Sequence, residues 1–451
     1  LNLEAGAQLM ITRNRVQSRD LTIGIVGLGY VGLPTALGFH DAGFNVIGLD
    51  VSERVINCLQ NGENPGDDPA FDDSIPTDEK WKVTTNPLDS IPYCDVIIVT
   101  VPTPISDDNK PDLRFVQSAG DAAFQNLDAQ KRPIVVLEST VYPGVTREVW
   151  GPLLEKYQLT EGVDVDLAYC PERFVPGDPI HGVRQVPRVV GANDPTICST
   201  LADLYSTLTS GEVYPVSSIE VAEASKVVEN VQRDLNIALV NELALIFPEI
   251  GLDVEEVLNA AATKWNFHRY SPGIGVGGHC IPVDPYYLIQ KATAAGAPVD
   301  LITSARSVNA NMPKQVATRV LTQAEKLGRT AENLKILLLG WSYKPGISDV
   351  RETPSEPLAS ALINAGSEVF VWDPFIQEED MHGIPGIWIK SPFDASADVV
   401  ILCTAHQEVL EINWKKLRET SELGLFYDGR RVTNFEELQN IGWITTGVGY
   451  P

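Results

Sequence analysis

The sequence predicts an α/β protein: two Rossmann-like, doubly wound parallel-sheet domains joined by a central helical segment with a long helix. Short buried strands alternate with helical patterns early in the chain, and the same alternation restarts at Lys335. Such alternation is typical of a parallel sheet covered by helices. The residues between the two α/β stretches carry helical patterns instead. We therefore expect an N-terminal domain at 1–215, a central helical segment at 216–325 and a C-terminal domain at 326–451.

Composition narrows the class of protein. The 451 residues are enough for two or three domains, and 44% of them are hydrophobic. No apolar run is long enough to span a bilayer, and residues 1–20 lack the apolar block of a signal peptide, so we expect a cytoplasmic protein without a membrane partner. The net charge of −26 argues against a nucleic-acid partner. The cysteines and histidines show neither disulfide-framework nor zinc-ligand spacing, so no metal is expected.

A glycine fingerprint follows the first predicted strand, residues 22–26. It opens a helical pattern that runs to about residue 41, and a second strand then ends at Asp50. In this context the glycines allow a tight turn and close approach of a pyrophosphate, while the carboxylate bonds a ribose hydroxyl and disfavours the extra phosphate of NADP. The alternative is a tight strand–helix turn without a ligand. The predicted NAD-binding residues are Gly27, Gly29, Tyr30, Val31, Gly32 and Asp50.

Three further strands are predicted in the N-terminal domain, at 95–101, 133–140 and 166–170, after a polar loop with a short helix at 61–90. Ligands of parallel sheets bind beyond the carboxyl ends of the strands. The side chains that follow these strands are therefore candidates for the site: Thr103, Thr140 and Glu172. For each of them, a cap or turn role is the alternative.

The central segment begins with a predicted capping box at 217–220, and its long helix is expected to stop before Pro248. Lys226 and Asn230 lie four residues apart on it and so share a face. A helical lysine usually belongs to a solvated face, but the neighbours of Lys226 are more apolar than a surface stripe. Such a helical section commonly joins two α/β halves and carries a dimer interface.

The stretch 271–288 places four glycines just before a cysteine. Pro282 suits the first turn of a helix, which puts Cys280 at or just before a helix N-terminus, where the backbone N–H groups favour the thiolate. Asp284 follows one helical turn later. A thiol and a carboxylate beside a glycine-lined space, which includes Gly277, indicate covalent catalysis with assisted proton transfer. The alternative is a buried cysteine after a flexible loop.

The C-terminal stretch repeats the strand–glycine–helix–strand–acid order between Lys335 and Asp373, without the three-glycine fingerprint. Further strands are predicted at 397–404 and 424–430. We expect a second, degenerate Rossmann-like domain. Its loop at 341–351 offers Lys344 and Arg351 as phosphate-binding cations.

These motifs together resemble the UDP-sugar 6-dehydrogenases, the four-electron NAD enzymes that include UDP-glucose and GDP-mannose dehydrogenases. The resemblance covers nearly the whole chain from about residue 21. Its markers are Gly27-Leu-Gly-Tyr-Val-Gly-Leu-Pro34, Ser139-Thr140, Pro171-Glu172, Glu223-Ala-Ser-Lys226 with Asn230, Gly277-Gly-His-Cys280 with Asp284, and Lys344 with Arg351. It implies an NAD domain, a helical dimerisation segment and a domain for the nucleotide sugar.

The resemblance also implies a role for each matching residue. Cys280 would be the nucleophile, Lys226 and Asn230 would stabilise an oxyanion, and Asp284 would act with a water. The remaining roles are placing that water, for Thr140 and Glu172; binding NAD, for Thr103, Thr140 and Arg351; and holding the UDP-sugar, for Lys226, Asn230, Gly277, Lys344 and Arg430. UDP-glucose enzymes carry a second glutamate four residues after the first, where this chain has Pro176.

The context Gly-Gly-His-Cys-Ile-Pro-Val-Asp-Pro-Tyr-Tyr at 277–287 is most similar to enzymes that oxidise UDP-N-acetylhexosamines, and the segments 263–267 and 305–313 favour UDP-GlcNAc or UDP-GalNAc over UDP-ManNAc. The alternatives are a UDP-glucose 6-dehydrogenase, a two-electron hydroxyacid dehydrogenase and a non-catalytic nucleotide-sugar binding protein. A hydroxyacid dehydrogenase has no need of Cys280. A binding protein has no need of Cys280, Lys226 and Asp284 together.

Overall fold

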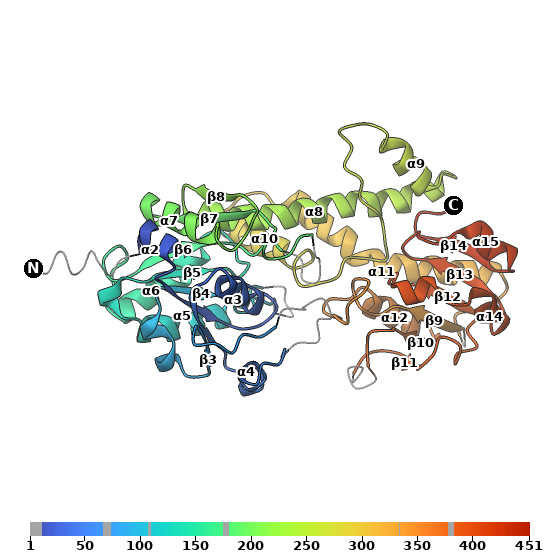
Figure 1. The fold of residues 1–451 in the computed structure, drawn as a ribbon. Helices are drawn as coiled ribbons and strands as arrows, with labels where there is room; N and C mark the ends of the chain where they lie inside the picture. The colour runs from blue at the N-terminus through green and yellow to red at the C-terminus, as the bar shows by residue number, and fades with distance from the viewer. Residues whose placement is uncertain (1–10, 66–73, 107–109, 175–179, 333, 378–382) are drawn as a thin grey trace, which may run out of the picture. The chain divides into compact units, whose positions relative to one another are not determined.

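The computed structural model describes residues 11–65, 74–106, 110–174, 180–332, 334–377 and 383–451. The chain forms two compact units (Figure 1). The first comprises Leu1–Glu229 and Tyr286–Ala295, and the second comprises Asn230–Pro285 and Gly296–Pro451. Each unit is built around one sheet. The division into three domains at 215/216 and 325/326 stays a prediction.

The sheet of the first unit has the strand order β3-β2-β1-β4-β5-β6-β7-β8. Its strands are β1 (Thr22–Val26), β2 (Asn45–Leu49), β3 (Trp81–Thr84), β4 (Val96–Val99), β5 (Ile134–Leu137), β6 (Asp166–Tyr169), β7 (Arg188–Ala192) and β8 (Val213–Val216). The strands β1 to β6 follow the Rossmann order. They are added on one side of β1 up to β3 and on the other side from β4 on, so the topological switch point lies between β1 and β4. β7 runs antiparallel to β6, a pairing that needs no crossover helix. The predicted doubly wound fold is confirmed.

Helices cover both faces of this sheet and bury one apolar core on each. The first core packs against α2 (Arg13–Ser18), α3 (Gly32–Asp41), α4 (Glu53–Gln60) and α7 (Pro195–Tyr205). The second packs against α5 (Arg114–Asn126), α6 (Val145–Lys156) and the start of α8 (Ile219–Glu249). Strands buried on both faces explain the continuous apolar runs in the sequence.

The second unit repeats the plan with a six-stranded, all-parallel sheet of order β11-β10-β9-β12-β13-β14. Its strands are β9 (Lys335–Leu339), β10 (Glu368–Trp372), β11 (Ile387–Trp388), β12 (Val399–Leu402), β13 (Leu425–Asp428) and β14 (Ile444–Gly447). This is again the Rossmann order, so the predicted second copy is confirmed. Its reversal point lies between β9 and β12.

The helices of the second unit also divide between two cores. One core holds part of α8 together with α9 (Val254–Ala261), α11 (Asp300–Lys326) and α12 (Ser355–Asn364). The other holds α13 (Gln407–Leu410), α14 (Trp414–Glu419) and α15 (Phe435–Asn440). α10 (Asp284–Ala294) begins in the second unit and continues in the first.

Three local predictions were wrong. The region 61–90 contains β3, a half-exposed edge strand whose short span gives little alternation to detect. The hydroxyl of Ser218, one residue after the predicted cap, accepts the bond from Val221 N that opens α8. Pro248 lies inside α8, which ends one residue later at Glu249. Gly251 follows with φ of +76°, and this conformation supports the closing bond from Leu252 N to Phe247 O.

Within the described ranges, every helix is too short or too polar to cross a membrane.

Candidate active site

The glycine fingerprint forms a tight turn between β1 and α3. Gly27 has φ of +93°, and a Cβ on Gly32 would lie 1.8 Å from the carbonyl oxygen of Gly27. A Cβ on Gly29 would meet nothing within 4 Å, so the backbone there borders open space at the start of α3. A helix N-terminus with an open glycine approach fits the pyrophosphate of a dinucleotide.

Asp50 follows β2 and is tied to this turn. Its Oδ2 accepts a hydrogen bond of 2.7 Å from Leu28 N, and its Oδ1 accepts one of 2.8 Å from Ser52 N. The carboxylate is therefore held next to the glycine turn, at the end of the second strand. That is where a ribose hydroxyl is bound in a dinucleotide fold, and the residues present fit NAD.

Lys226 and Glu172 meet in the first unit. Lys226 is only 5% exposed, and its Nζ donates a hydrogen bond of 2.6 Å to the carbonyl oxygen of Glu172. The same Nζ lies 3.6 Å from the Glu172 carboxylate. Lys226 is therefore not on a solvated helix face, where helical lysines usually lie. Burying an ammonium group is unfavourable unless such partners compensate.

The other predicted residues of the first unit lie at strand ends, as expected. The carbonyl of Thr103 accepts a 2.7 Å bond from Tyr287 Oη on α10. Thr140 follows Ser139, whose Oγ donates a hydrogen bond of 2.6 Å to Val101 O. This bond joins the loops after β4 and β5. Pro176 lies outside the described residues.

Glu223, one turn before Lys226 on α8, holds the loop that follows Thr140. Its carboxylate accepts hydrogen bonds from Gly144 N at 2.5 Å, Thr146 N at 2.9 Å and Thr146 Oγ1 at 2.7 Å. Burial raises the pKa of Glu223, against the lowering effect of these bonds. The marker residue Glu223 thus caps α6, a structural role that the sequence alone did not reveal.

Cys280 lies in the second unit, one turn ahead of α10. Asp284 N donates 2.8 Å to the carbonyl of Cys280, and this bond sets the one-turn spacing between thiol and carboxylate. Pro282 therefore lies in the turn before the helix instead of in its first turn. Asp284 is buried, at 1% exposed, and it accepts a hydrogen bond from Asn230 Nδ2, whose Oδ1 in turn accepts one from Arg233.

A buried polar network, not foreseen from the sequence, anchors both ends of the glycine–cysteine segment. At one end, Arg306 Nη1 donates a hydrogen bond of 3.0 Å to Pro282 O, and Arg306 Nε donates one of 2.7 Å to the Asp234 carboxylate. At the other end, Gly273 N donates 2.9 Å to Asn241 Oδ1. Asn309 links the two ends, since it donates to Asp234 and accepts from Asn241. Polar residues at helical spacing on otherwise apolar stretches of α8 and α11 are the signal that could have found them.

Side chains of the protein itself pack directly against the glycines of this segment. A Cβ on Gly277 would lie 2.6 Å from Tyr343 Cβ, and one on Gly278 would lie 2.8 Å from the Tyr343 ring. A Cβ on Gly273 would lie 2.9 Å from Arg430 Nη1. The segment therefore packs closely on the loops after β9 and β13.

The predicted cations of the second unit lie in those same loops. Arg430 is half-buried, its Nε donates 2.6 Å to Cys403 O, and burial lowers its pKa. Lys344 is partly exposed in the loop after β9. Arg351 pairs with Asp349 at 2.5 Å, and its carbonyl accepts a bond from Gly278 N.

Cys280 differs from most of the other cysteines. Burial raises the pKa of Cys94, Cys170 and Cys403 to about 12, and it also raises that of Cys198. Those thiols stay protonated and inert at neutral pH. Cys280 is partly exposed, a property that it shares with Cys58.

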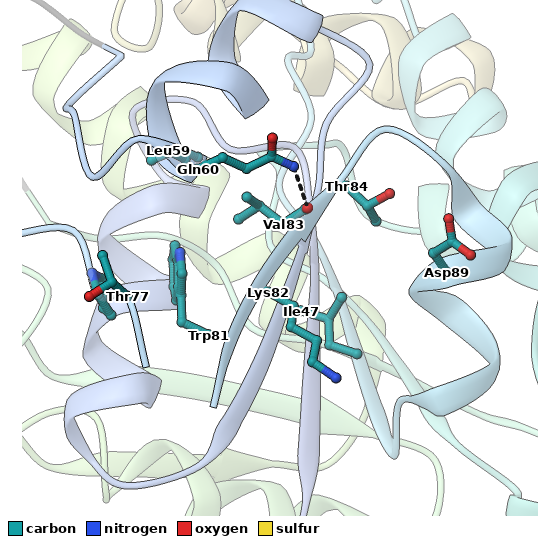
Figure 2. A pocket seen from close by; sticks show the side chains of 10 residues that line it. Ile47, Leu59, Gln60, Thr77, Trp81, Lys82, Val83, Thr84 and Asp89 are labelled. Carbon is teal, nitrogen blue, oxygen red and sulfur yellow. Dashed lines mark hydrogen bonds between the residues drawn. The ribbon is translucent and has the colours of Figure 1, made fainter. Parts of the chain in front are cut away.

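A pocket of about 450 Å³ lies at the edge of the first sheet, between α4, β3 and the turn at Pro87–Asp89 (Figure 2). Gln60 Nε2 donates to Val83 O beside it, at 3.4 Å. None of its lining residues belongs to the predicted site. For metals, the described part of the chain holds no group of three or more histidine, cysteine or acidic side chains suited to an ion.

Sequence comparison places this geometry in a family. Three domains of the UDP-glucose/GDP-mannose dehydrogenase family match the chain: the NAD binding domain over residues 21–209, the central domain over 220–311 and the UDP binding domain over 337–435. The chain is 37% identical to protein CapL of Staphylococcus aureus, covering 92% of this chain and 97% of that one.

Two further relatives are as extensive. The chain is 38% identical to a UDP-N-acetyl-D-glucosamine 6-dehydrogenase of Pseudomonas aeruginosa, over 89% of this chain and 94% of that one. It matches the structure of a UDP-D-ManNAc dehydrogenase from Pyrococcus horikoshii with a TM-score of 0.85 and 31% identity, over 95% and 99% of the two chains. The chain therefore belongs to the UDP-glucose/GDP-mannose dehydrogenase family and is a nucleotide-sugar dehydrogenase with an NAD cofactor.

Proposed function

We propose that the enzyme oxidises the 6-hydroxyl of a UDP-N-acetylhexosamine to the carboxylate, in a four-electron reaction through a thioester on Cys280. The observation that carries this proposal is the setting of Cys280. Cys280 is partly exposed, its segment is anchored at both ends by buried hydrogen bonds, and a buried carboxylate follows one turn later. A nucleophile held on a fixed backbone meets the geometric demand of covalent catalysis.

The chemistry follows in balanced steps. Bound NAD supplies the hydride acceptor, one NAD for each two-electron oxidation. The first oxidation turns the 6-hydroxyl into an aldehyde and releases a proton. The Cys280 thiolate then forms a C–S bond to the aldehyde carbon, and the second oxidation of this thiohemiacetal leaves a thioester. Water attacks the thioester, the C–S bond breaks, and the acid and the thiolate are released.

Charged and polar side chains would serve these steps. Lys226 is a buried cation and, with Asn230, would stabilise the negative charge that develops on the substrate oxygen. Asp284 would take a proton from the attacking water, which Thr140 and Glu172 would place. These roles stay proposals, since they come from the family resemblance.

Binding roles complete the proposal. The residues proposed to hold NAD are Gly27, Gly29, Tyr30, Val31, Gly32, Asp50, Thr103, Thr140 and Arg351. Those proposed to hold the UDP-sugar are Lys226, Asn230, Gly277, Lys344 and Arg430. The match of residues 337–435 to a UDP binding domain supports the last two assignments.

The choice of an N-acetylhexosamine rests on the relatives. Two of the extensive matches carry N-acetylated sugars in their names, as a UDP-N-acetyl-D-glucosamine and a UDP-D-ManNAc enzyme. The sequence context at 277–287 points the same way. UDP-GlcNAc or UDP-GalNAc is our preferred substrate, and UDP-glucose is the alternative.

The decisive experiment is NADH formation with UDP-GlcNAc, UDP-GalNAc, UDP-ManNAc and UDP-glucose, each supplied in limiting amount. Two NADH should appear per sugar consumed, and the product should be an acid without free aldehyde. One NADH per sugar would return the chain to a two-electron dehydrogenase. Inactivity with all four sugars would favour a binding protein, and preference for UDP-glucose would correct the sugar.

Variants of Cys280 test the covalent step. Cys280→Ala should abolish acid formation but leave UDP-sugar and NAD binding intact. Cys280→Ser should lose turnover and accumulate an acyl-enzyme visible by intact-protein mass spectrometry, because an oxygen ester hydrolyses more slowly than a thioester. Cys58→Ser removes the other partly exposed thiol and serves as the matched control, with unchanged rates. Full activity of the Ala variant would remove Cys280 from the mechanism.

A homodimer formed through the central segment, in the cytoplasm, completes the proposal. Large apolar side chains of the segment are exposed in the single chain, among them Trp265 at 91%, Leu301 at 72% and Leu239 at 54%. Exposed apolar side chains of this size often mark an interface. Light scattering should give twice the mass of the chain, and Leu239→Glu should reduce it to that of the monomer. A monomeric unmodified enzyme would contradict the dimer.

A further inference from the structure

A buried histidine lies at the reversal point of the second sheet, outside all the roles assigned above. His406 follows β12 and is fully buried. Its Nε2 lies 2.8 Å from Ser342 Oγ and 3.1 Å from Asp373 Oδ2. Its Nδ1 accepts a 3.0 Å hydrogen bond from Gly346 N. His406 thus joins the loops that follow β9, β10 and β12, where ligands of such sheets bind.

The cluster of Ser342, His406 and Asp373 is not a nucleophilic triad. In a triad, the serine and the acid contact opposite nitrogens of the imidazole. Here both contact Nε2, and Ser342 Oγ itself donates 3.0 Å to Asp373 Oδ2. Asp373 also accepts bonds from Trp341 N and Ser342 N, at 2.6 and 2.9 Å. All three side chains are buried, so no substrate reaches the hydroxyl.

The contacts fix the tautomer of His406. A backbone N–H can only donate, so Nδ1 must carry a lone pair toward Gly346. The ring proton is then on Nε2, where it faces the Asp373 carboxylate and the Ser342 hydroxyl. Asp373 corresponds in its strand position to Asp50 of the first sheet. One acid ends the second strand beside the fingerprint glycines, and the other holds this imidazole.

The acceptor on His406 acts on the loop that carries Lys344. Gly346 lies two residues after Lys344 with φ of +78°, a backbone conformation that few residues adopt. On the far side of Lys344, Tyr343 N is bonded to Asp349 O at 3.0 Å, and its side chain packs on Gly277 and Gly278. The hydrogen bond to His406 Nδ1 therefore fixes the backbone just beyond Lys344.

We propose that His406 is a positioning residue for nucleotide binding: its Nδ1 lone pair holds Gly346, and thereby Lys344, in the conformation that receives the phosphates of the UDP-sugar. Asp373 acts through His406, because it keeps the ring proton on Nε2. The inference rests on the proposed contact between Lys344 and the nucleotide.

Two substitutions of His406 separate the two ring nitrogens. The side-chain oxygen of His406→Asn lies near the position of Nδ1 and preserves an acceptor for Gly346. The side-chain amide of His406→Gln lies near Nε2 and preserves a donor for Asp373, but it leaves Gly346 N without its acceptor. H406Q should weaken binding of UDP and raise the KM for UDP-sugar by roughly 3- to 10-fold, the worth of one hydrogen bond. H406N should affect both far less, and neither variant should change the KM for NAD or lower kcat more than about two-fold.

Lys344→Ala separates this inference from the proposed function. Titration calorimetry with UDP alone gives the affinities of K344A, H406Q and the double variant. If His406 acts through Lys344, H406Q should weaken binding little further in the K344A background. Unchanged affinity in K344A would overturn the nucleotide role of Lys344. Weak binding in K344A with unchanged binding in H406Q would overturn only the positioning role. Equal losses in H406N and H406Q would mean that His406 merely supports the core.

Gly346→Ala keeps the test open if H406Q fails to fold. A Cβ at Gly346 meets nothing within 4 Å, so it clashes with no neighbour and disturbs only the left-handed backbone. G346A leaves the buried cluster untouched and should weaken UDP binding as H406Q does. Gly328 provides the matched control, since it also has positive φ and an open Cβ position but lies after α11. Full UDP affinity in G346A would contradict the proposal.

Discussion

Lys226 Nζ donates a 2.6 Å hydrogen bond to the backbone carbonyl of Glu172 and lies 3.6 Å from the carboxylate of the same residue. Glu172, in the loop after β6, thus provides two partners that help to compensate the buried ammonium group. A hydrogen bond of 3.4 Å from Glu172 N to Glu138 O ties that residue to the end of β5. These contacts therefore link the cation to the loops that follow β5 and β6.

The first prediction is that Lys226→Ala lowers kcat by roughly 10²- to 10³-fold, as loss of one oxyanion donor does, while the KM for NAD stays within about two-fold. Lys156→Ala is the control, because it removes an exposed lysine of the first unit that is paired with Asp121. Steady-state rates of NADH formation measure both. Wild-type kcat in the K226A variant would exclude Lys226 from charge stabilisation.

The central strands of both sheets, from β1, β2, β4, β5 and β6 to β9, β10, β12 and β13, followed from local patterns. The glycine turns, the apolar runs and the acidic residues Asp50 and Asp373 can each be recognised from a short stretch of sequence. Five strands were not predicted: β3, β7, β8, β11 and β14. Of these, β3 and β11 are edge strands that are short and half-exposed. Strand pairing depends on partners far away in the chain.

The residues of the candidate site also divide into those recognisable from local sequence and those whose roles depend on distant partners. Cys280, Asp284 and Lys226 carry chemistry and stand in recognisable motifs, so they could be nominated. The roles of Arg306 and His406 could not be predicted, because these roles are hydrogen bonds to residues 24 and 60 positions away. The sequence shows neither their partners nor their burial.

The second prediction concerns cofactor choice. Asp50→Asn keeps an oxygen for Leu28 N but removes the charge that repels the extra phosphate of NADP. The preference of the enzyme for NAD over NADP, measured as the ratio of kcat/KM values, should shrink by roughly ten-fold or more, equivalent to about 1.4 kcal/mol. Glu53→Gln, an exposed acid three residues away, is the control. Equal use of both cofactors by the unmodified enzyme would refute the role of Asp50.

The third prediction concerns Arg430. Arg430→Ala should raise the KM for UDP-sugar far more than that for NAD, because a charged contact to phosphate is lost. Gly273→Ala should have a milder effect of the same kind, since its Cβ would lie 2.9 Å from Arg430 Nη1 and push the guanidinium aside. Arg329→Ala removes a surface ion pair of the same unit and is the control. An unchanged KM in R430A would place the nucleotide elsewhere.

The last prediction concerns the buried pair of Glu138 and Arg188. Both side chains are fully buried, 3.4 Å apart, and Tyr205 Oη donates 2.6 Å to the same carboxylate oxygen. Burial raises the pKa of Glu138, against the opposing effect of Arg188. Removing one partner leaves an uncompensated charge, so Arg188→Met should destabilise the first unit by about 3–5 kcal/mol. Arg188→Met with Glu138→Leu replaces both charges by apolar groups and should recover most of that loss.

Local unfolding is the quantity to measure, because a chain with two compact units has no single unfolding free energy. Hydrogen exchange should speed up in peptides that contain β5 and β7 for the single variant, and return toward the unmodified rate for the double one. Peptides that contain β9 and β13 of the second unit are the internal control. If the double variant exchanges as fast as the single one, packing rather than charge explains the loss. If the single variant exchanges as slowly as the unmodified chain, the pair contributes nothing to the stability of the sheet.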